Sequence, residues 1–116
     1  MYTIKKTFVV SAAHSLTLSY ESKCENLHGH NWKITVTIMG PSLDENGMLM
    51  DFSHIKLLVN SKFDHSNLNN LLDQPTAENI SKYLCDSINK HLQLPSAKCV
   101  RVEVEETDGS YASYDL

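Results

Sequence analysis

The chain has 116 residues, 41% of them apolar, and a formal net charge of −4 at neutral pH. This length and apolar content predict one globular domain over residues 1–116, because a chain of this size can fill a single core. The negative charge excludes a general affinity for nucleic acid or for anionic membranes, and an anionic substrate would need a local cationic pocket.

The sequence also indicates a compartment and a redox state. No run of about 18 apolar residues occurs, and the first residues, MYTIKKTFVV, lack the apolar region and cleavage site of a signal peptide. We therefore expect a cytoplasmic protein without membrane contact. The three cysteines stand at unrelated spacings, which argues against a disulfide framework and leaves thiols for metal binding or catalysis.

Two predicted strands carry histidine on their apolar side. Alternation of apolar and polar residues predicts a strand over residues 2–14, and His14 ends its apolar side. The same alternation predicts a strand over residues 28–39, whose apolar side begins with His28 and His30. Burial of an unpaired polar group costs roughly a few kcal/mol, so polar residues at these positions indicate the lining of a functional site.

The middle of the chain predicts a short strand and two helices. After the turn residues GPSLDENG, the segment MLMDF predicts a returning strand at residues 48–52. Apolar residues at helical spacing predict a helix that Ser53 caps and that runs to about Phe63. A second helix opens at the Pro-Thr pair of residues 75–76, and Pro95 ends that segment.

The remaining segments complete the predicted fold. Residues 64–74, DHSNLNNLLDQ, are expected to form a loop. The last clear strand covers residues 99–107, with Glu106 on its apolar side. The order strand, strand, short strand, helix, helix, strand predicts an α+β fold, in which an antiparallel sheet carries both helices on one face.

The three histidines on apolar strand positions predict a metal site. Residues two apart on a strand point to the same side, so His28 and His30 can offer imidazoles to one ion, and Gly29 permits close backbone approach. With His14 from a neighbouring strand, the set matches a catalytic zinc site that keeps a free fourth position. The alternative is that His-Gly-His is an ordinary strand start.

Other polar residues allow two interpretations each. Cys24 is either a fourth zinc ligand, which would make the site structural, or a thiolate base or nucleophile beside the metal, favoured by Lys23. Asp64 and His65 are either capping and surface groups or a catalytic pair. Glu106 either reaches water at the end of its strand or contacts a ligand.

The motifs together resemble a known family. In chain order they are His14, CENLHGH at 24–30, FDH at 63–65, PTAEN at 75–79 and VEVEET at 102–107. They resemble the motifs of the 6-pyruvoyl-tetrahydropterin synthase and 6-carboxy-tetrahydropterin synthase family over nearly the whole chain. The three residues between the cysteine and His-Gly-His are similar to the bacterial carboxy-tetrahydropterin branch, which feeds queuosine synthesis.

The resemblance implies roles for particular residues. They are zinc ligands His14, His28 and His30; catalytic residues Cys24, Asp64 and His65; and substrate-binding residues Glu106, Thr107 and Glu25. Cys24 would be the base rather than a ligand, and His65, oriented by Asp64, would be its acid/base partner. Glu106 would accept two parallel hydrogen bonds from the edge of the pterin.

The resemblance also implies a reaction and an assembly. The reaction is the zinc-dependent conversion of 7,8-dihydroneopterin triphosphate to 6-carboxytetrahydropterin, acetaldehyde and triphosphate. The fold is the tunnelling T-fold, whose sheets join into a β-barrel in a homohexamer, a dimer of trimers, with active sites at subunit boundaries. Lysines or arginines of another chain would then meet the triphosphate.

Two alternatives stay open. Glu25 resembles a glutamate of family members that cleave the same substrate to 6-hydroxymethyl-dihydropterin for folate synthesis, so the product would be that pterin or both pterins. The other alternative is a non-catalytic module whose zinc site is closed by one cysteine and three histidines.

Overall fold

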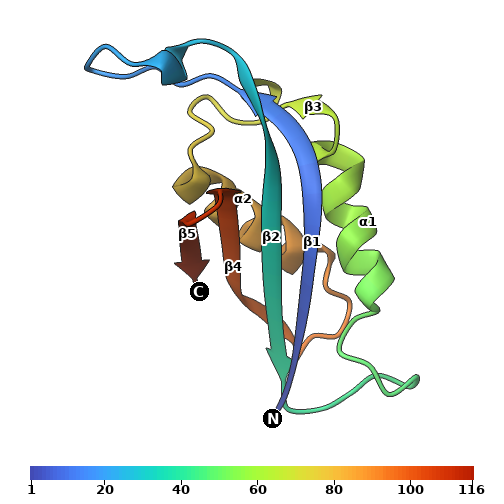
Figure 1. The fold of residues 1–116 in the computed structure, drawn as a ribbon. Coiled ribbons are helices and arrows are strands. Elements are labelled where there is room, and N and C mark those ends of the chain that lie inside the picture. The colour runs from blue at the N-terminus through green and yellow to red at the C-terminus, as the bar shows by residue number, and fades with distance from the viewer.

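Five strands form one sheet in the computed structural model, which describes residues 1–116 (Figure 1). The sheet order is β3-β1-β2-β4-β5. The strands are β1 (Tyr2–His14), β2 (His28–Gly40), β3 (Ser66–Asn67), β4 (Lys98–Thr107) and β5 (Ser110–Asp115). All neighbours pair antiparallel except the two-residue β3, which pairs parallel with β1. The sheet is therefore mixed only at that edge.

The register of β1 and β2 brings their histidines together. The two strands pair without a bulge from Tyr2 opposite Gly40 to His14 opposite His28. Their helix-facing positions form the core, as the alternation predicted, and the buried members are Phe8, Val10, Ala12, His14, Trp32, Ile34, Val36 and Ile38. The histidines thus occupy the last layer of a continuous buried ladder.

Both helices cover the same face of the sheet (Figure 1), which confirms the predicted α+β arrangement. Helix α1 (Phe52–Phe63) and helix α2 (Ala77–His91) each bury one stripe of residues, at i, i+4 and i+8. The stripes consist of Ile55, Val59 and Phe63, and of Ile80, Leu84 and Ile88. Each such side chain stabilises the fold by about 1.5–3 kcal/mol. Neither helix is long and apolar enough to cross a membrane.

The predicted strand at residues 48–52 is wrong. This segment is irregular, and Leu49 is buried where the expected strand would have buried Met48 and Phe52. Asp51, rather than Ser53, caps helix α1, because its carboxylate accepts hydrogen bonds from the Ser53 N–H at 2.8 Å and from the Ser53 hydroxyl at 2.7 Å. The helix therefore begins at Phe52 and leaves no room for a strand.

The structure contains three short elements that the sequence did not clearly predict. The expected loop over residues 64–74 contains β3 and a 3-10 helix, η2 (Leu68–Asn70). Leu68 is buried and anchors this segment to the core. Strand β5 follows a turn at Gly109, whose φ of 83° lies in the left-handed region that glycine tolerates. Alternation in SYASYD is too weak to predict a strand by itself.

A register shift changes which residues of β4 enter the core. The pairing of β2 with β4 shifts between Thr37 and Ile38, so that Cys99 rather than Val100 lies opposite Ile38. Cys99 is fully buried, whereas Val100 is half-buried. Cys85 on α2 is also fully buried, and its thiol donates to the Cys99 carbonyl at 3.4 Å. Both cysteines are free and buried, and they pack as small apolar residues.

The buried thiol predicts loss of stability in alkaline solution. Burial raises the pKa of Cys99 to about 12, from an ordinary value of 9.0. Above pH 9 the unfolded chain releases this proton while the folded chain keeps it, so the free energy of unfolding falls, by up to about 1.4 kcal/mol per pH unit from this group. Urea denaturation of the metal-free protein from pH 8 to 11 should show a shallower decline in Cys99→Ala. Parallel curves for the two proteins would contradict the assignment.

Candidate metal and catalytic site

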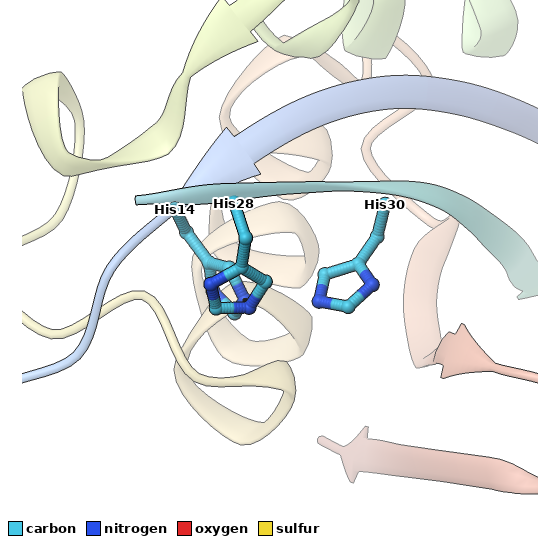
Figure 2. Close-up of side chains that lie close together, drawn as sticks. All are labelled: His14, His28 and His30. Atoms are coloured by element: carbon cyan, nitrogen blue, oxygen red, sulfur yellow. Dashed lines mark hydrogen bonds between the residues drawn. The ribbon is translucent and has the colours of Figure 1, made fainter. Parts of the chain in front are cut away.

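Three histidines gather on one side of the sheet, where β1 ends and β2 begins (Figure 2). His14 is fully buried, and His28 and His30 are half-buried. One ring nitrogen from each lies within 4.8 Å of the other two. The shortest separation, 3.1 Å, joins Nε2 of His14 to Nε2 of His28. The three rings therefore offer nitrogen atoms to one small volume.

Backbone carbonyls fix the tautomers of two of these rings. His14 Nδ1 lies 2.7 Å from the Pro75 carbonyl, and His28 Nδ1 lies 2.7 Å from the Asn26 carbonyl. A carbonyl only accepts, so each Nδ1 must carry the proton and each neutral ring has its lone pair on Nε2. The two lone pairs then face each other across 3.1 Å. This arrangement is repulsive unless a cation lies between the two nitrogens.

His30 presents a third unpaired nitrogen. Its Nε2 is buried and has no hydrogen-bond partner, a situation that costs about 1–3 kcal/mol when nothing compensates it. Burial lowers the pKa of His30 below its ordinary value, the Glu106 carboxylate opposes this, and His14 and His28 lower it further. The ring is therefore neutral at neutral pH, which is the form that binds metals.

A tryptophan forms one wall of the histidine cluster. The Trp32 ring meets the rings of His14 and His30 edge to face, with centroids 4.9 Å and 5.2 Å away. Its indole N–H donates to the Ala12 carbonyl at 3.1 Å, so the ring is itself held in place. Trp32 thus limits the rotation of two of the three imidazoles.

Glu106 adds a negative charge to the same volume. Its Oε1 lies 3.3 Å from Nε2 of His14 and 3.7 Å from Nε2 of His30, and about a third of its side chain is exposed. Glu106 therefore lies beside the histidines, and its contact with a ligand stays a prediction. Thr107, the next residue and the end of β4, is exposed.

The donor set fits a divalent metal ion. Tetrahedral zinc with bonds of about 2.0–2.1 Å places neighbouring ligand atoms about 3.4 Å apart. The separations of 3.1 Å between His14 and His28 and of 3.3 Å between His14 and Glu106 are of this size. Three imidazoles with a carboxylate beside them suit zinc among other transition metals. His14, His28 and His30 could therefore hold an ion that keeps a position open for an oxygen ligand.

Cys24 stands in the loop before the cluster. It lies in the 3-10 helix η1 (Lys23–Glu25), is half-buried, and does not belong to the close group of metal-binding atoms. Its backbone carbonyl accepts a hydrogen bond from the Leu16 N–H at 2.8 Å. The neighbouring Glu25 is exposed. The catalytic role of Cys24 stays a prediction.

Asp64 and His65 are paired but lie away from the histidine cluster. Asp64 is the C-cap of helix α1, where its N–H donates to the Asn60 carbonyl at 3.1 Å, and its Oδ1 accepts from the Ser11 N–H of β1 at 2.9 Å. His65 is 83% exposed, lies 3.5 Å from the other Asp64 oxygen, and has a φ of 58°. A left-handed non-glycine residue costs about 1–2 kcal/mol, and such strain is common at functional sites.

The pair lies at the edge of the sheet, beside β1. His65 borders a surface hollow whose lining includes His30, together with Ser11 and Asn31. The side chains of Ser11 and Asn31 alternate along β1 and β2 with the buried positions that lead to His14 and His30, so they face the other side of the sheet. Within one chain, the predicted acid/base pair makes no hydrogen bond or ion pair with the predicted metal ligands.

The sequence did not predict the groups that orient the rings. Two of them are backbone carbonyls, of Asn26 and Pro75, which no side-chain pattern reveals. Trp32 was predicted only as a member of the apolar ladder. Its position two residues after His30 on the same side of the strand was the available signal.

Comparison with known proteins agrees with this geometry. A family model described as 6-pyruvoyl tetrahydropterin synthase matches residues 3–116. The 6-carboxy-5,6,7,8-tetrahydropterin synthase of Bacillus subtilis is 33% identical over 123 residues, which cover 97% of this chain and 84% of the relative. The dihydroneopterin monophosphate aldolase of Pyrococcus furiosus is 36% identical over 84 residues, which cover 70% of this chain and 69% of the relative.

The fold agrees with a solved structure of the same family. The structure of Caenorhabditis elegans 6-pyruvoyl tetrahydropterin synthase matches with a TM-score of 0.80 and 28% identity, over 99% of this chain and 95% of that one. The predicted T-fold is thereby confirmed for the protomer. Because the family model spans nearly the whole chain and the fold agrees over its full length, the protein belongs to the 6-pyruvoyl tetrahydropterin synthase family.

Proposed function

We propose that the protein is a zinc-dependent 6-carboxy-5,6,7,8-tetrahydropterin synthase, a carbon-carbon lyase acting on 7,8-dihydroneopterin triphosphate. The convergence of three lone-pair nitrogens, from His14, His28 and His30, is the observation that carries the proposal. Likeness over 97% of the chain to the Bacillus subtilis enzyme of that name supports the choice of reaction. The reaction consumes one water, whose oxygen enters the new carboxylate, and the products are 6-carboxytetrahydropterin, acetaldehyde and triphosphate. The pathway served is queuosine synthesis in the cytoplasm.

The residues divide the work between binding and proton transfer. Zinc held by the three histidines supplies Lewis-acid stabilisation of negative charge that develops on the substrate side chain. Cys24, as thiolate, removes a proton from that side chain, and His65 returns one while Asp64 holds its ring. Glu106 is suited to the pterin because a carboxylate accepts two parallel hydrogen bonds from an amidine-like edge. Thr107 borders the same edge.

We further propose that a second subunit completes each site. Asp64 and His65 make no hydrogen bond or ion pair with their own histidine cluster, so an acid/base pair from another copy would serve it. The open edges of the sheet support such an assembly, because β5 ends the sheet and β1 is paired with β3 only at Ala12 and Ala13. Closure of sheets from several copies into a barrel, in a homohexamer, would remove both edges.

A second candidate reaction is aldol cleavage to 6-hydroxymethyl-dihydropterin. Two observations favour it: Glu25 directly follows Cys24 and is exposed, and the Pyrococcus furiosus relative is named as a dihydroneopterin monophosphate aldolase. A carboxylate beside the thiol offers a second base, which would take a proton from a different substrate hydroxyl. The two reactions share the metal and the pterin site and differ in product.

Product analysis separates the two reactions. Purified protein incubated with 7,8-dihydroneopterin triphosphate should release 6-carboxytetrahydropterin and acetaldehyde, both identified by mass spectrometry. Glu25→Ala should still give this pterin as the product, because Glu25 is proposed to bind the substrate and transfers none of the protons of this reaction. If wild type releases 6-hydroxymethyl-dihydropterin and Glu25→Ala does not, the aldolase is the correct function.

Metal analysis separates the enzyme from a closed zinc module. Cys24→Ala should keep one zinc per chain and lose turnover. His28→Ala should weaken zinc binding by more than about 100-fold, because it removes a ligand, whereas changes to residues that only surround the ligands cost about 10–100-fold. Cobalt substitution should give no thiolate charge-transfer band in wild type. Such a band, together with loss of zinc in Cys24→Ala, would identify Cys24 as a fourth zinc ligand and would contradict its proposed role as a catalytic base.

A further inference from the structure

The loop that carries Cys24 is attached to the rest of the chain at very few points. Residues 15–27 connect β1 to β2 and extend beyond the end of the sheet (Figure 1). Besides the contact between the Asn26 carbonyl and the His28 ring, every hydrogen bond between this loop and the rest of the chain involves the side chain of Asn69 or Gln74. The position of the loop therefore depends on two amide groups.

Each side-chain amide makes two hydrogen bonds to one loop residue, one with its backbone N–H and one with its backbone carbonyl. The Ser15 N–H donates to Asn69 Oδ1 at 2.8 Å, and Asn69 Nδ2 donates to the Ser15 carbonyl at 2.9 Å. The Thr17 N–H donates to Gln74 Oε1 at 3.0 Å, and Gln74 Nε2 donates to the Thr17 carbonyl at 2.7 Å. A side-chain amide used in this way replaces a neighbouring strand, because it supplies one acceptor and one donor.

The residue between these two anchored residues is hydrogen-bonded to Cys24. Leu16 lies between Ser15 and Thr17, and its N–H donates to the Cys24 carbonyl at 2.8 Å. This is the backbone bond that joins the outgoing and returning halves of the loop. With Leu16 fixed on both sides, the backbone of Cys24 has a fixed partner.

The same segment also orients a metal ligand. Pro75, the residue after Gln74, supplies the carbonyl that accepts from His14 Nδ1. The Gln74 carbonyl in turn accepts from Asn79 Nδ2 at 2.9 Å, which ties the segment to the first turn of helix α2. Residues 69–75 therefore hydrogen-bond both to the loop segment that holds the Cys24 backbone and to the ring of His14.

We propose that Asn69 and Gln74 are positioning residues, which set the place of the Cys24 thiol relative to the metal ligands. This inference rests on the proposed function, in which Cys24 moves a proton. Neither side chain touches the site itself, and both act through Leu16. The bonds of Asn69 are partly buried and those of Gln74 are exposed, so Asn69 should contribute more.

The test replaces each amide with its acid. In Asn69→Asp and Gln74→Glu the side chain still accepts from the loop N–H, but a carboxylate oxygen now repels the loop carbonyl. Asn89→Asp is the matched control, because Asn89 grips the backbone of Cys99 in the same two-bonded way, at 2.9 Å and 3.0 Å, between α2 and β4. The full-length protein with bound zinc is used throughout.

The expected result separates position from stability. Asn69→Asp should lower kcat by about 10–100-fold, the usual effect of misplacing a catalytic group by about 1 Å, with zinc content and KM close to wild type. Gln74→Glu, at an exposed position that should tolerate the change, should act in the same direction more weakly. In both variants the Leu16 amide should exchange with solvent deuterium faster. Asn89→Asp should lower the denaturation midpoint while it leaves kcat and Leu16 exchange unchanged.

Three results would overturn the inference. The first is an unchanged kcat in both loop variants, and the second is a loss of kcat that follows zinc loss or unfolding as in Asn89→Asp. The third is unchanged Leu16 exchange, which reports the geometric link even if the proposed reaction is wrong. Failure of the proposed function is seen separately, as full turnover in Cys24→Ala.

Discussion

The geometry of the site is dominated by one unfavourable contact, in which the lone pairs on Nε2 of His14 and Nε2 of His28 face each other. These nitrogens lie 3.1 Å apart, and carbonyls of Pro75 and Asn26 hold the proton of each ring on its far side. Without a cation the two atoms repel, and neither ring can turn away without losing its carbonyl. The fold therefore directs three donor nitrogens inward, next to the Glu106 carboxylate, in an arrangement that could hold a metal ion.

Burial makes this arrangement effective. The histidines continue the apolar ladders of β1 and β2, so Trp32 and the core exclude water that would otherwise satisfy the ring nitrogens. Exclusion of water also lowers the pKa of His30, which keeps this ligand neutral. Glu106, about a third of whose side chain is exposed, places its carboxylate 3.3 Å from Nε2 of the buried His14. The packing that stabilises the sheet thus also keeps water from the ring nitrogens of the histidines at its end.

The sequence predicted the parts of the site that follow from local periodicity. Alternation with a period of two placed His14, His28 and His30 on the core side, and the structure places them there because an unbroken antiparallel register keeps both ladders in phase. Alternation gave the wrong buried residue where the strand register shifts, as at the bulge that buries Cys99 instead of Val100. It also could not place residues whose position depends on tertiary contacts, such as the grips of Asn69 and Gln74.

The location of Asp64 and His65 has a consequence for how the enzyme is built. A strand has two faces, and the ligand histidines share the inner one, whereas Asp64 and His65 bond to the backbone of Ser11 at the edge of the sheet. The left-handed backbone of His65 is held by its N–H, which donates to the Ser11 carbonyl, so the ring is presented outward rather than folded against its own chain. Strain maintained in this way fixes the direction of an exposed imidazole before any partner arrives. The three histidines that could hold a metal ion point to the inner side of the sheet, whereas the exposed His65 ring lies beside β1 and has Asp64 as its ion-pair partner, so the roles proposed for the two groups rest on separate parts of the fold.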